Sequence, residues 1–141
     1  MVRRLQVAVD CADPDRLAGF WVSVLGYVLD TPPAGYTSWH GFSAAVGGRD
    51  ESWSAVVDPA GNGPRVLFHR VPEPKVGKNR LHLDVRVSAA GGVPAEIRRR
   101  QVDAEVARLQ AAGGTYLRTE QDEYDYFVVM ADPEGNEFCI N

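Results

Sequence analysis

The sequence predicts an α+β protein built from two tandem βαβββ modules. The chain has 141 residues, which suits one compact domain or two small halves that share a core. Short segments recur in the same order about 75 residues apart. Each half also begins with a strand-like pattern, continues with a helical one and returns to strands. We therefore expect a single domain over 1–141, with a first module at about 1–72, a linker at about 72–79 and a second module at about 80–141.

The internal repeat is marked by weak matches that keep one order along the chain. Residues 4–9 (RLQVAV) resemble residues 80–85 (RLHLDV), and residues 57–62 (VDPAGN) resemble residues 131–136 (ADPEGN). Several weak matches in one order indicate a tandem repeat more strongly than any of them alone. The first marker makes Gln6 the counterpart of His82.

The first half opens with a β-branched, alternating segment at 4–10, which predicts a strand. Asp13 and Pro14 then suit the N-cap and first position of a helix, and Gly26 suits its end. Apolar residues between them follow helical spacing and predict one buried stripe: Leu17, Phe20, Trp21, Val24 and Leu25. Further strands are expected at 27–30, 36–46, 52–57 and 66–71, with turns at 32–35 and 47–50.

The second half repeats this plan after a linker that contains Pro72, Pro74 and Gly77. The pattern predicts a strand at 80–87, and Ile97, Val102, Val106 and Leu109 lie largely on one side of a helix at 94–112. Strands are expected at 115–118, 124–130 and 137–140.

Composition and charge narrow the class of protein. The chain is 45% hydrophobic and 24% charged, as in ordinary soluble proteins, and its net charge of −4 disfavours binding to nucleic acid or an anionic membrane. No apolar run approaches the length of a signal-peptide core or a membrane span. The two cysteines, Cys11 and Cys139, are not spaced like a disulfide scaffold, so we expect reduced thiols and a cytoplasmic protein.

Ordered motifs along nearly the whole chain carry a family resemblance. They are DPDRL at 13–17, FW at 20–21, LGY at 25–27, VPEPK at 71–75, KNRLHLD at 78–84 and DPEGNEFC at 132–139. The chain resembles the vicinal oxygen chelate superfamily and its glyoxalase, bleomycin resistance and dihydroxybiphenyl dioxygenase-like group. The resemblance implies a half-open barrel made by the two modules, a cavity that holds a metal or a ligand, and a homodimer.

The metal site implied by this resemblance is only partly present. The family uses His or Gln on the first strand of each module and Glu on the last, and Gln6 and His82 match the former. Cys139 stands where the second module would have its glutamate, and the strand at 65–70 has no carboxylate. Gln6, His82, His69 and Cys139 could form a softer cluster for Zn, Ni, Mn or Fe. The missing carboxylates favour the absence of a metal over its presence.

His82 and Asp84 are the candidate catalytic residues. They lie two positions apart on one strand and so share a sheet face, which suits a base with its orienting carboxylate or an ordinary buried polar pair. His69 faces the same cavity only in one of two strand registers. Cys139 is best interpreted as a small apolar filler rather than a reactive thiol.

Aromatic residues on the predicted strands are candidates for the walls of a ligand cavity. They are Trp39, Trp53, Phe68 and Tyr126. Aromatic side chains are also usual in sheet cores, so a structural role is the alternative.

Three functions follow from these observations. The leading interpretation is a protein that binds a small organic molecule between its sheets, without the standard metal site. One alternative is a metal-dependent lyase, isomerase or dioxygenase-type enzyme. The other is a resistance protein that sequesters an antibiotic, which needs apolar walls but no group for proton transfer.

Overall fold

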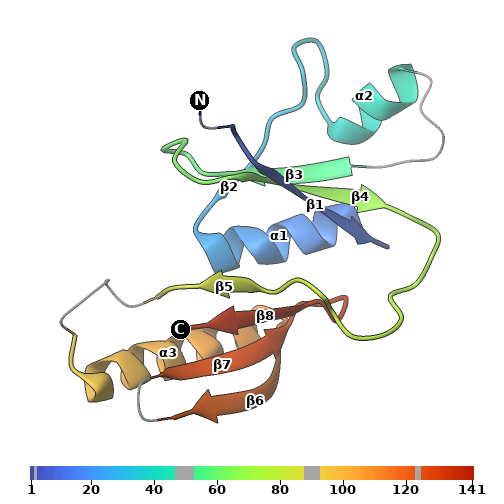
Figure 1. Ribbon diagram of the computed structural model, residues 1–141. Coiled ribbons are helices and arrows are strands. Elements are labelled where there is room, and N and C mark those ends of the chain that lie inside the picture. The colour runs from blue at the N-terminus through green and yellow to red at the C-terminus, as the bar shows by residue number, and fades with distance from the viewer. Residues whose placement is uncertain (2, 47–52, 88–92, 123–124) are drawn as a thin grey trace. The chain divides into compact units, whose positions relative to one another are not determined.

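The structure is a computed structural model and describes residues 1, 3–46, 53–87, 93–122 and 125–141 (Figure 1). The chain divides into two compact units, Met1–Lys75 and Val76–Asn141, which we call the N-terminal and C-terminal modules. The N-terminal module contains β1 (Gln6–Cys11), α1 (Pro14–Leu25), β2 (Val28–Leu29), α2 (Trp39–Ala45), β3 (Trp53–Val57) and β4 (Arg65–Arg70). The C-terminal module contains β5 (Leu83–Val85), α3 (Ala95–Ala111), β6 (Thr115–Gln121), β7 (Tyr126–Ala131) and β8 (Glu137–Ile140).

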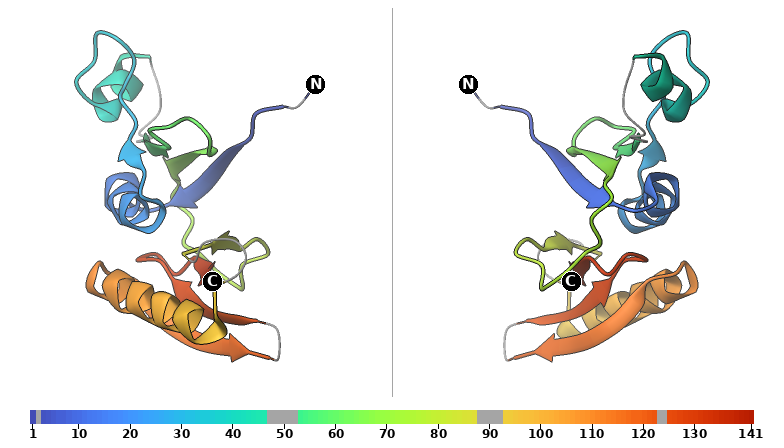
Figure 2. Two further views of the ribbon diagram at one scale, coloured as in Figure 1. Left: turned by 90° about the vertical axis from the view of Figure 1, so that its left-hand side faces the viewer. Right: turned by 90° about the vertical axis from the view of Figure 1, so that its right-hand side faces the viewer.

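Both modules have the same sheet topology. The strand orders are β1-β4-β3-β2 and β5-β8-β7-β6, so the first strand of each module pairs in parallel with the last. The other neighbours are antiparallel. One helix covers one face of each sheet, α1 in the N-terminal module and α3 in the C-terminal module (Figure 2). The predicted α+β class and the two βαβββ modules are confirmed.

The strand register extends the sequence repeat to individual positions. Ala8 lies opposite Leu67 in the first parallel pair, and its repeat counterpart Asp84 lies opposite Cys139 in the second. Leu67 is therefore the structural counterpart of Cys139. Neither position carries a carboxylate.

The helix α1 forms where the sequence caps it and buries most of its predicted stripe, whereas α3 has no side-chain N-cap and leaves the predicted Ile97 exposed. The Asp13 carboxylate accepts a hydrogen bond from the Arg16 N–H at 3.1 Å, and Gly26 ends α1 with a left-handed backbone at φ 66°. The buried apolar residues of α1 pack on β3 and β4, and those of α3 on the second sheet. Fully buried large side chains include Leu17, Val66 and Phe68 in one module and Leu109, Met130 and Phe138 in the other.

The strand predicted at 36–46 is wrong, because most of this segment is the helix α2. Ser38 is its N-cap, with the side-chain oxygen accepting the Gly41 N–H at 3.0 Å. Trp39 and Phe42 are three residues apart and thus lie on one side of the helix. The tight cap and this helical spacing outweigh the aromatic content that favoured a strand. The predicted turn at 47–50 lies outside the described residues.

Two other predicted elements differ in length. The strand expected at 80–87 is confined to Leu83–Val85, because only these residues pair with β8. The strand expected at 115–118 continues to Gln121 and pairs with β7 across an irregularity between Tyr116 and Arg118. Residue 124, the expected start of another strand, lies outside the described residues.

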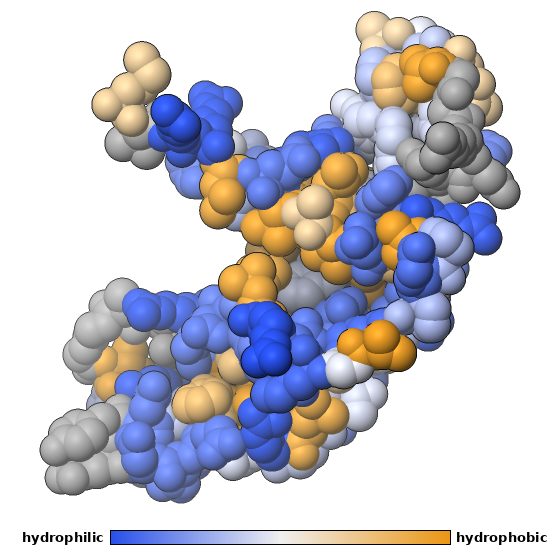
Figure 3. All heavy atoms as spheres, turned by 45° about the vertical axis from the view of Figure 1, so that its right-hand side comes forward, coloured by the Kyte–Doolittle hydropathy of each residue, from blue (hydrophilic) through white to orange (hydrophobic). Residues whose placement is uncertain are grey.

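Hydrophobic and hydrophilic residues are interspersed on the visible surface, with some large apolar side chains exposed (Figure 3). Leu5, Leu29 and Leu81 are examples. None of the helices in the described ranges is long and apolar enough to cross a lipid bilayer.

Candidate functional site

The N-terminal sheet has one face that α1 does not cover, which we call the face opposite α1. Side chains alternate along β4, so Val66 and Phe68 are buried toward the core while Arg65 and His69 are only partly buried on the opposite face. The strand register places Gln6 beside Arg65 and Trp53 beside His69 on that same face. Polar and aromatic groups from three strands therefore share one surface.

Arg65 organises the first part of this surface. Its Nε donates to Asp30 Oδ2 at 2.7 Å, and its Nη1 donates to Gln6 Oε1 at 2.9 Å. Its guanidinium carbon lies 5.4 Å from the centre of the Trp39 ring, and Trp39 Nε1 donates to the Asp30 carbonyl at 3.0 Å. These contacts fix the guanidinium between a carboxylate, an amide and an indole.

Five rings form the second part, which we call the aromatic cluster. The rings belong to Tyr36, Trp39, Phe42, Trp53 and His69. Phe42 is central, with ring centres 5.2 Å from Tyr36, 5.9 Å from Trp39 and 6.5 Å from Trp53. The indole and phenyl rings of the cluster are half-buried, so they keep apolar surface in contact with solvent. Such a set of rings beside a cation suits a planar organic ligand.

His69 lies on the predicted face but far from the other predicted ligand of its module. Its Nδ1 is 3.8 Å from Asp10 Oδ1, and its ring centre is 6.1 Å from that of Trp53. Gln6 lies four residues before Asp10 on β1, which places it roughly 13 Å along the strand. The two side chains do not converge on one ion.

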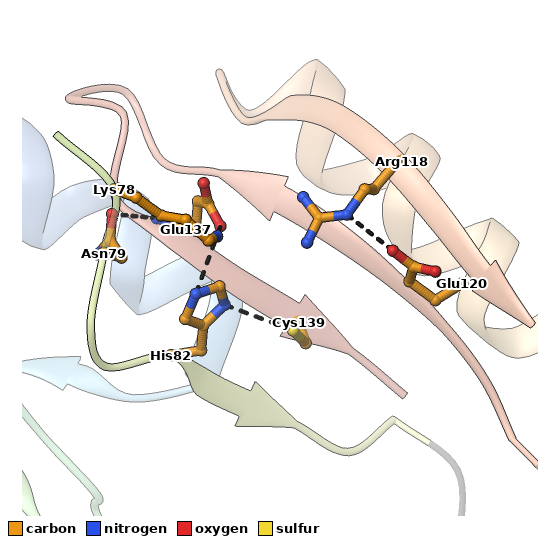
Figure 4. Close-up of polar contacts among 7 residues, drawn as sticks. All are labelled: Lys78, Asn79, His82, Arg118, Glu120, Glu137 and Cys139. Atoms are coloured by element: carbon orange, nitrogen blue, oxygen red, sulfur yellow. Dashed lines mark hydrogen bonds and ion pairs between the residues drawn. The ribbon is translucent and has the colours of Figure 1, made fainter.

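In the C-terminal module, His82 lies between two side chains of β8 (Figure 4). Its Nε2 is 3.4 Å from Glu137 Oε2, and its Nδ1 is 3.9 Å from Cys139 Sγ. Lys78 Nζ also contacts Glu137 Oε2, at 2.8 Å, and Asn79 accepts the Glu137 backbone N–H. Both ring nitrogens of His82 therefore face protein partners.

The environment of Cys139 keeps its thiol protonated. Burial, followed by a hydrogen bond to the Asp84 side chain and the charge of that carboxylate, raises the pKa of Cys139 to about 11. Asp84 thus acts on Cys139, and the structure shows no contact in which it orients His82. Conversely, the ammonium of Lys78 lowers the pKa of Glu137, with smaller contributions from His82 and Arg118.

Two predicted cavity residues face the helices instead. Phe68 is fully buried in the core on the side of Val66, and so cannot line the face opposite α1. The Tyr126 hydroxyl donates to Asp103 of α3, and the guanidinium of Arg99 lies 4.9 Å from the centre of its ring. Trp39 and Trp53 are the predicted cavity residues that the structure brings together.

Sequence reasoning missed Asp30, Arg65, Phe42 and Glu137. Glu137 was detectable, since it precedes Cys139 by two positions on one strand and must share its face. Arg65 was not, because its partners Gln6 and Asp30 are 59 and 35 residues away in the chain.

The residues present do not fit a chelated divalent metal. The Gln6 side-chain oxygen already accepts from a guanidinium, whose positive charge would oppose a nearby cation. The counterpart positions Leu67 and Cys139 supply a hydrocarbon and a thiol of raised pKa, and hard cations prefer carboxylates. No cluster of three or more His, Cys, Asp or Glu side chains suited to a metal occurs within the described residues.

Comparison with solved structures identifies the fold. A glyoxalase/bleomycin resistance protein/dioxygenase family enzyme from Burkholderia phytofirmans PsJN matches with a TM-score of 0.65 and 19% identity, over 96% of this chain and 94% of that one. The fosfomycin resistance protein FosX from Mesorhizobium loti matches with a TM-score of 0.65 and 10% identity, over 100% and 92%. A FosX from Listeria monocytogenes in complex with Mn(II) has a TM-score of 0.66 and 11% identity, over 100% and 90%.

The sequence itself gives the family. No curated protein matches it significantly. The model of the glyoxalase-like domain family, in contrast, matches residues 6–141. With this match and the shared fold of its structural neighbours, the chain belongs to the glyoxalase-like domain family of the vicinal oxygen chelate superfamily.

Proposed function

We propose that this chain binds a small planar organic molecule on the face of its N-terminal sheet opposite α1, without a chelated metal. The observation that carries the proposal is the half-buried aromatic cluster beside Arg65. Stacking on an indole and contact with a guanidinium would hold a flat ligand and fix its orientation. Shape and apolar contact are sufficient for binding, and no proton transfer is required.

The rings also have a structural role, because α2 packs on β3 through them. Trp21, a ring of the core, is closed to solvent at 3% exposure. Trp39, Phe42 and Trp53 are instead partly exposed. This difference favours a surface that receives another molecule.

A catalytic role for His82 is the second candidate, favoured by its contact with Glu137. A carboxylate at Nε2 orients an imidazole and leaves Nδ1 as the proton acceptor. Nδ1 faces Cys139, so a substrate would have to displace the thiol contact. We therefore place binding before catalysis. The FosX neighbours are named as fosfomycin resistance proteins, so fosfomycin and other antibiotics should be screened as ligands.

The binding proposal can be tested with 2-naphthamide, a flat and uncharged probe, by isothermal titration calorimetry. Trp53→Leu keeps apolar bulk but removes the ring, so we expect affinity to fall at least about tenfold. Trp39→Leu should have a similar effect. Tyr116→Leu, on the C-terminal module, is the matched control and should leave affinity unchanged.

His82→Ala separates the two candidates, because it should leave naphthamide affinity unchanged if the N-terminal module binds alone. Absence of saturable binding, or equal affinity in wild type and both tryptophan variants, would refute the proposal. Thermal unfolding of each variant confirms that the fold is intact.

A further inference from the structure

A hollow of about 680 Å³ lies in the N-terminal module beside the aromatic cluster. It is formed by the segment that leads into β1 and by the turn between β3 and β4. Its lining includes Arg3, Arg4, Asp58, Arg65 and the turn residues at 61–63. All of these residues belong to one module, so the hollow is a property of that module alone.

The hollow carries an excess of positive charge. Arg3, Arg4 and Arg65 contribute three guanidinium groups to its lining. Asp58 is the acidic residue of the lining, and its carboxylate accepts backbone N–H groups of its own turn from Ala60, Asn62 and Gly63 at 2.8–2.9 Å. Asp30 neutralises Arg65, but no carboxylate of the described residues pairs with Arg3 or Arg4. Two exposed guanidinium groups are thus available to an anion.

In the C-terminal module, protein groups occupy the region that corresponds to the hollow. Its counterpart turn, at 132–136, is held by Asp132 in the same way. There, however, the segment before the first strand is tied to β8, because Asn79 accepts the Glu137 N–H and Lys78 contacts the Glu137 carboxylate. In the N-terminal module Arg65 stands in place of Glu137, so the positive residues before β1 meet another positive residue.

We propose that the hollow binds the oxyanion, a carboxylate or phosphate, of the same ligand whose planar part contacts the aromatic cluster. Arg65 connects the two regions, since it lines the hollow and lies over the Trp39 ring. This inference rests on the proposed function and narrows the ligand to planar organic acids or phosphates. Guanidinium groups bind both oxyanions with paired N–H donors.

The test compares 2-naphthoate with 2-naphthamide, which share a ring system and differ in charge. Wild-type protein should bind 2-naphthoate about tenfold more tightly in low salt, and 0.5 M NaCl should remove most of this preference. The double variant Arg3→Ser/Arg4→Ser should abolish the preference and leave naphthamide affinity unchanged. The double variant Arg99→Ser/Arg100→Ser removes the same charge from α3 and should retain the preference.

Equal affinity for the two probes, or a preference that persists in Arg3→Ser/Arg4→Ser, would overturn the inference while naphthamide binding still supports the proposed function. If neither probe binds, titration with inorganic phosphate tests the anion site by itself. Phosphate should then shift the amide NMR signals of Gly61, Asn62 and Gly63 in wild type but not in Arg3→Ser/Arg4→Ser. Failure to shift them overturns the inference in that case as well.

Discussion

Arg65 determines the charge and the contacts of the surface around it. Solvent-exposed ion pairs contribute little stability in general. This guanidinium is only 28% exposed and has three different partners in Asp30, Gln6 and Trp39. The Arg65 guanidinium therefore takes up the side-chain oxygens of Asp30 and Gln6, which a chelated cation would need as ligands. A fixed positive charge in that place favours an anionic or π-rich partner over a metal ion.

Cys139 provides a prediction at the same scale. Because the pKa of its thiol is raised to about 11, little thiolate is present at pH 8. Alkylation of Cys139 by iodoacetamide in the native protein should be at least about a hundredfold slower than alkylation of an ordinary thiol. Peptide mass spectrometry over a time course measures the rate.

Unfolding in urea is the control for this measurement, since it should expose both Cys139 and the buried Cys11 to rapid labelling. The same shift links stability to pH. The folded state holds the thiol proton more tightly than the unfolded state, so this contribution to stability is present below pH 9 and lost as the pH rises toward 11. Rapid alkylation of native Cys139 at pH 8 would contradict the assigned environment.

At the scale of elements, α1 depends on the cap that begins it. Asp13→Ala removes the hydrogen bond to the Arg16 N–H and should lower the free energy of unfolding by about 1 kcal/mol. Asp13→Asn keeps an accepting oxygen and should retain most of the stability. Urea denaturation monitored by circular dichroism measures both variants. If the alanine variant were as stable as wild type, the cap would have no energetic role.

The helix α2 shows where element prediction from sequence failed. Aromatic residues at 36–46 favoured a strand, but Ser38 caps a helix that projects Trp39 and Phe42 from one side. Those rings meet Trp53 only because β3 passes beneath them. A helix of seven residues is too short to be marked by a long periodic pattern, so its tertiary contacts were needed to identify it.

At the scale of the whole molecule, the modules share a topology but differ in chemistry. The face opposite α1 in the N-terminal module has five rings and the ion-paired guanidinium of Arg65. The corresponding region of the C-terminal module has a histidine, a thiol and an ion-paired glutamate. The repeat therefore preserves the scaffold, while the side chains on the two sheets have diverged.

The homodimer and the cytoplasmic location expected from the sequence stay predictions.

The metal content of the protein is the most direct test of the proposal that it binds its ligand without a metal. Elemental analysis of protein purified without chelator or affinity tag should find Zn, Ni, Mn and Fe well below one ion per chain, because Gln6 and Cys139 are poor ligands here. Added divalent ions should not restore stoichiometry, and His82→Ala should have the same low content. Near one ion per chain, lost in His82→Ala, would refute metal-free binding.

The sequence by itself determined the two modules, the order of most of their elements and the approximate bounds of many of these elements. These features depend on local signals, such as the repeat at 4–9 and 80–85, the Asp13 cap and the apolar stripe of α1. Tertiary structure decided which side chains meet: Arg65 with Asp30 and Gln6, Phe42 with Trp53, and His82 with Glu137. The physical reason is that strand register and helix packing bring together residues far apart in the chain. Hydrophobic periodicity specifies which face is buried but does not identify the partners on the other face.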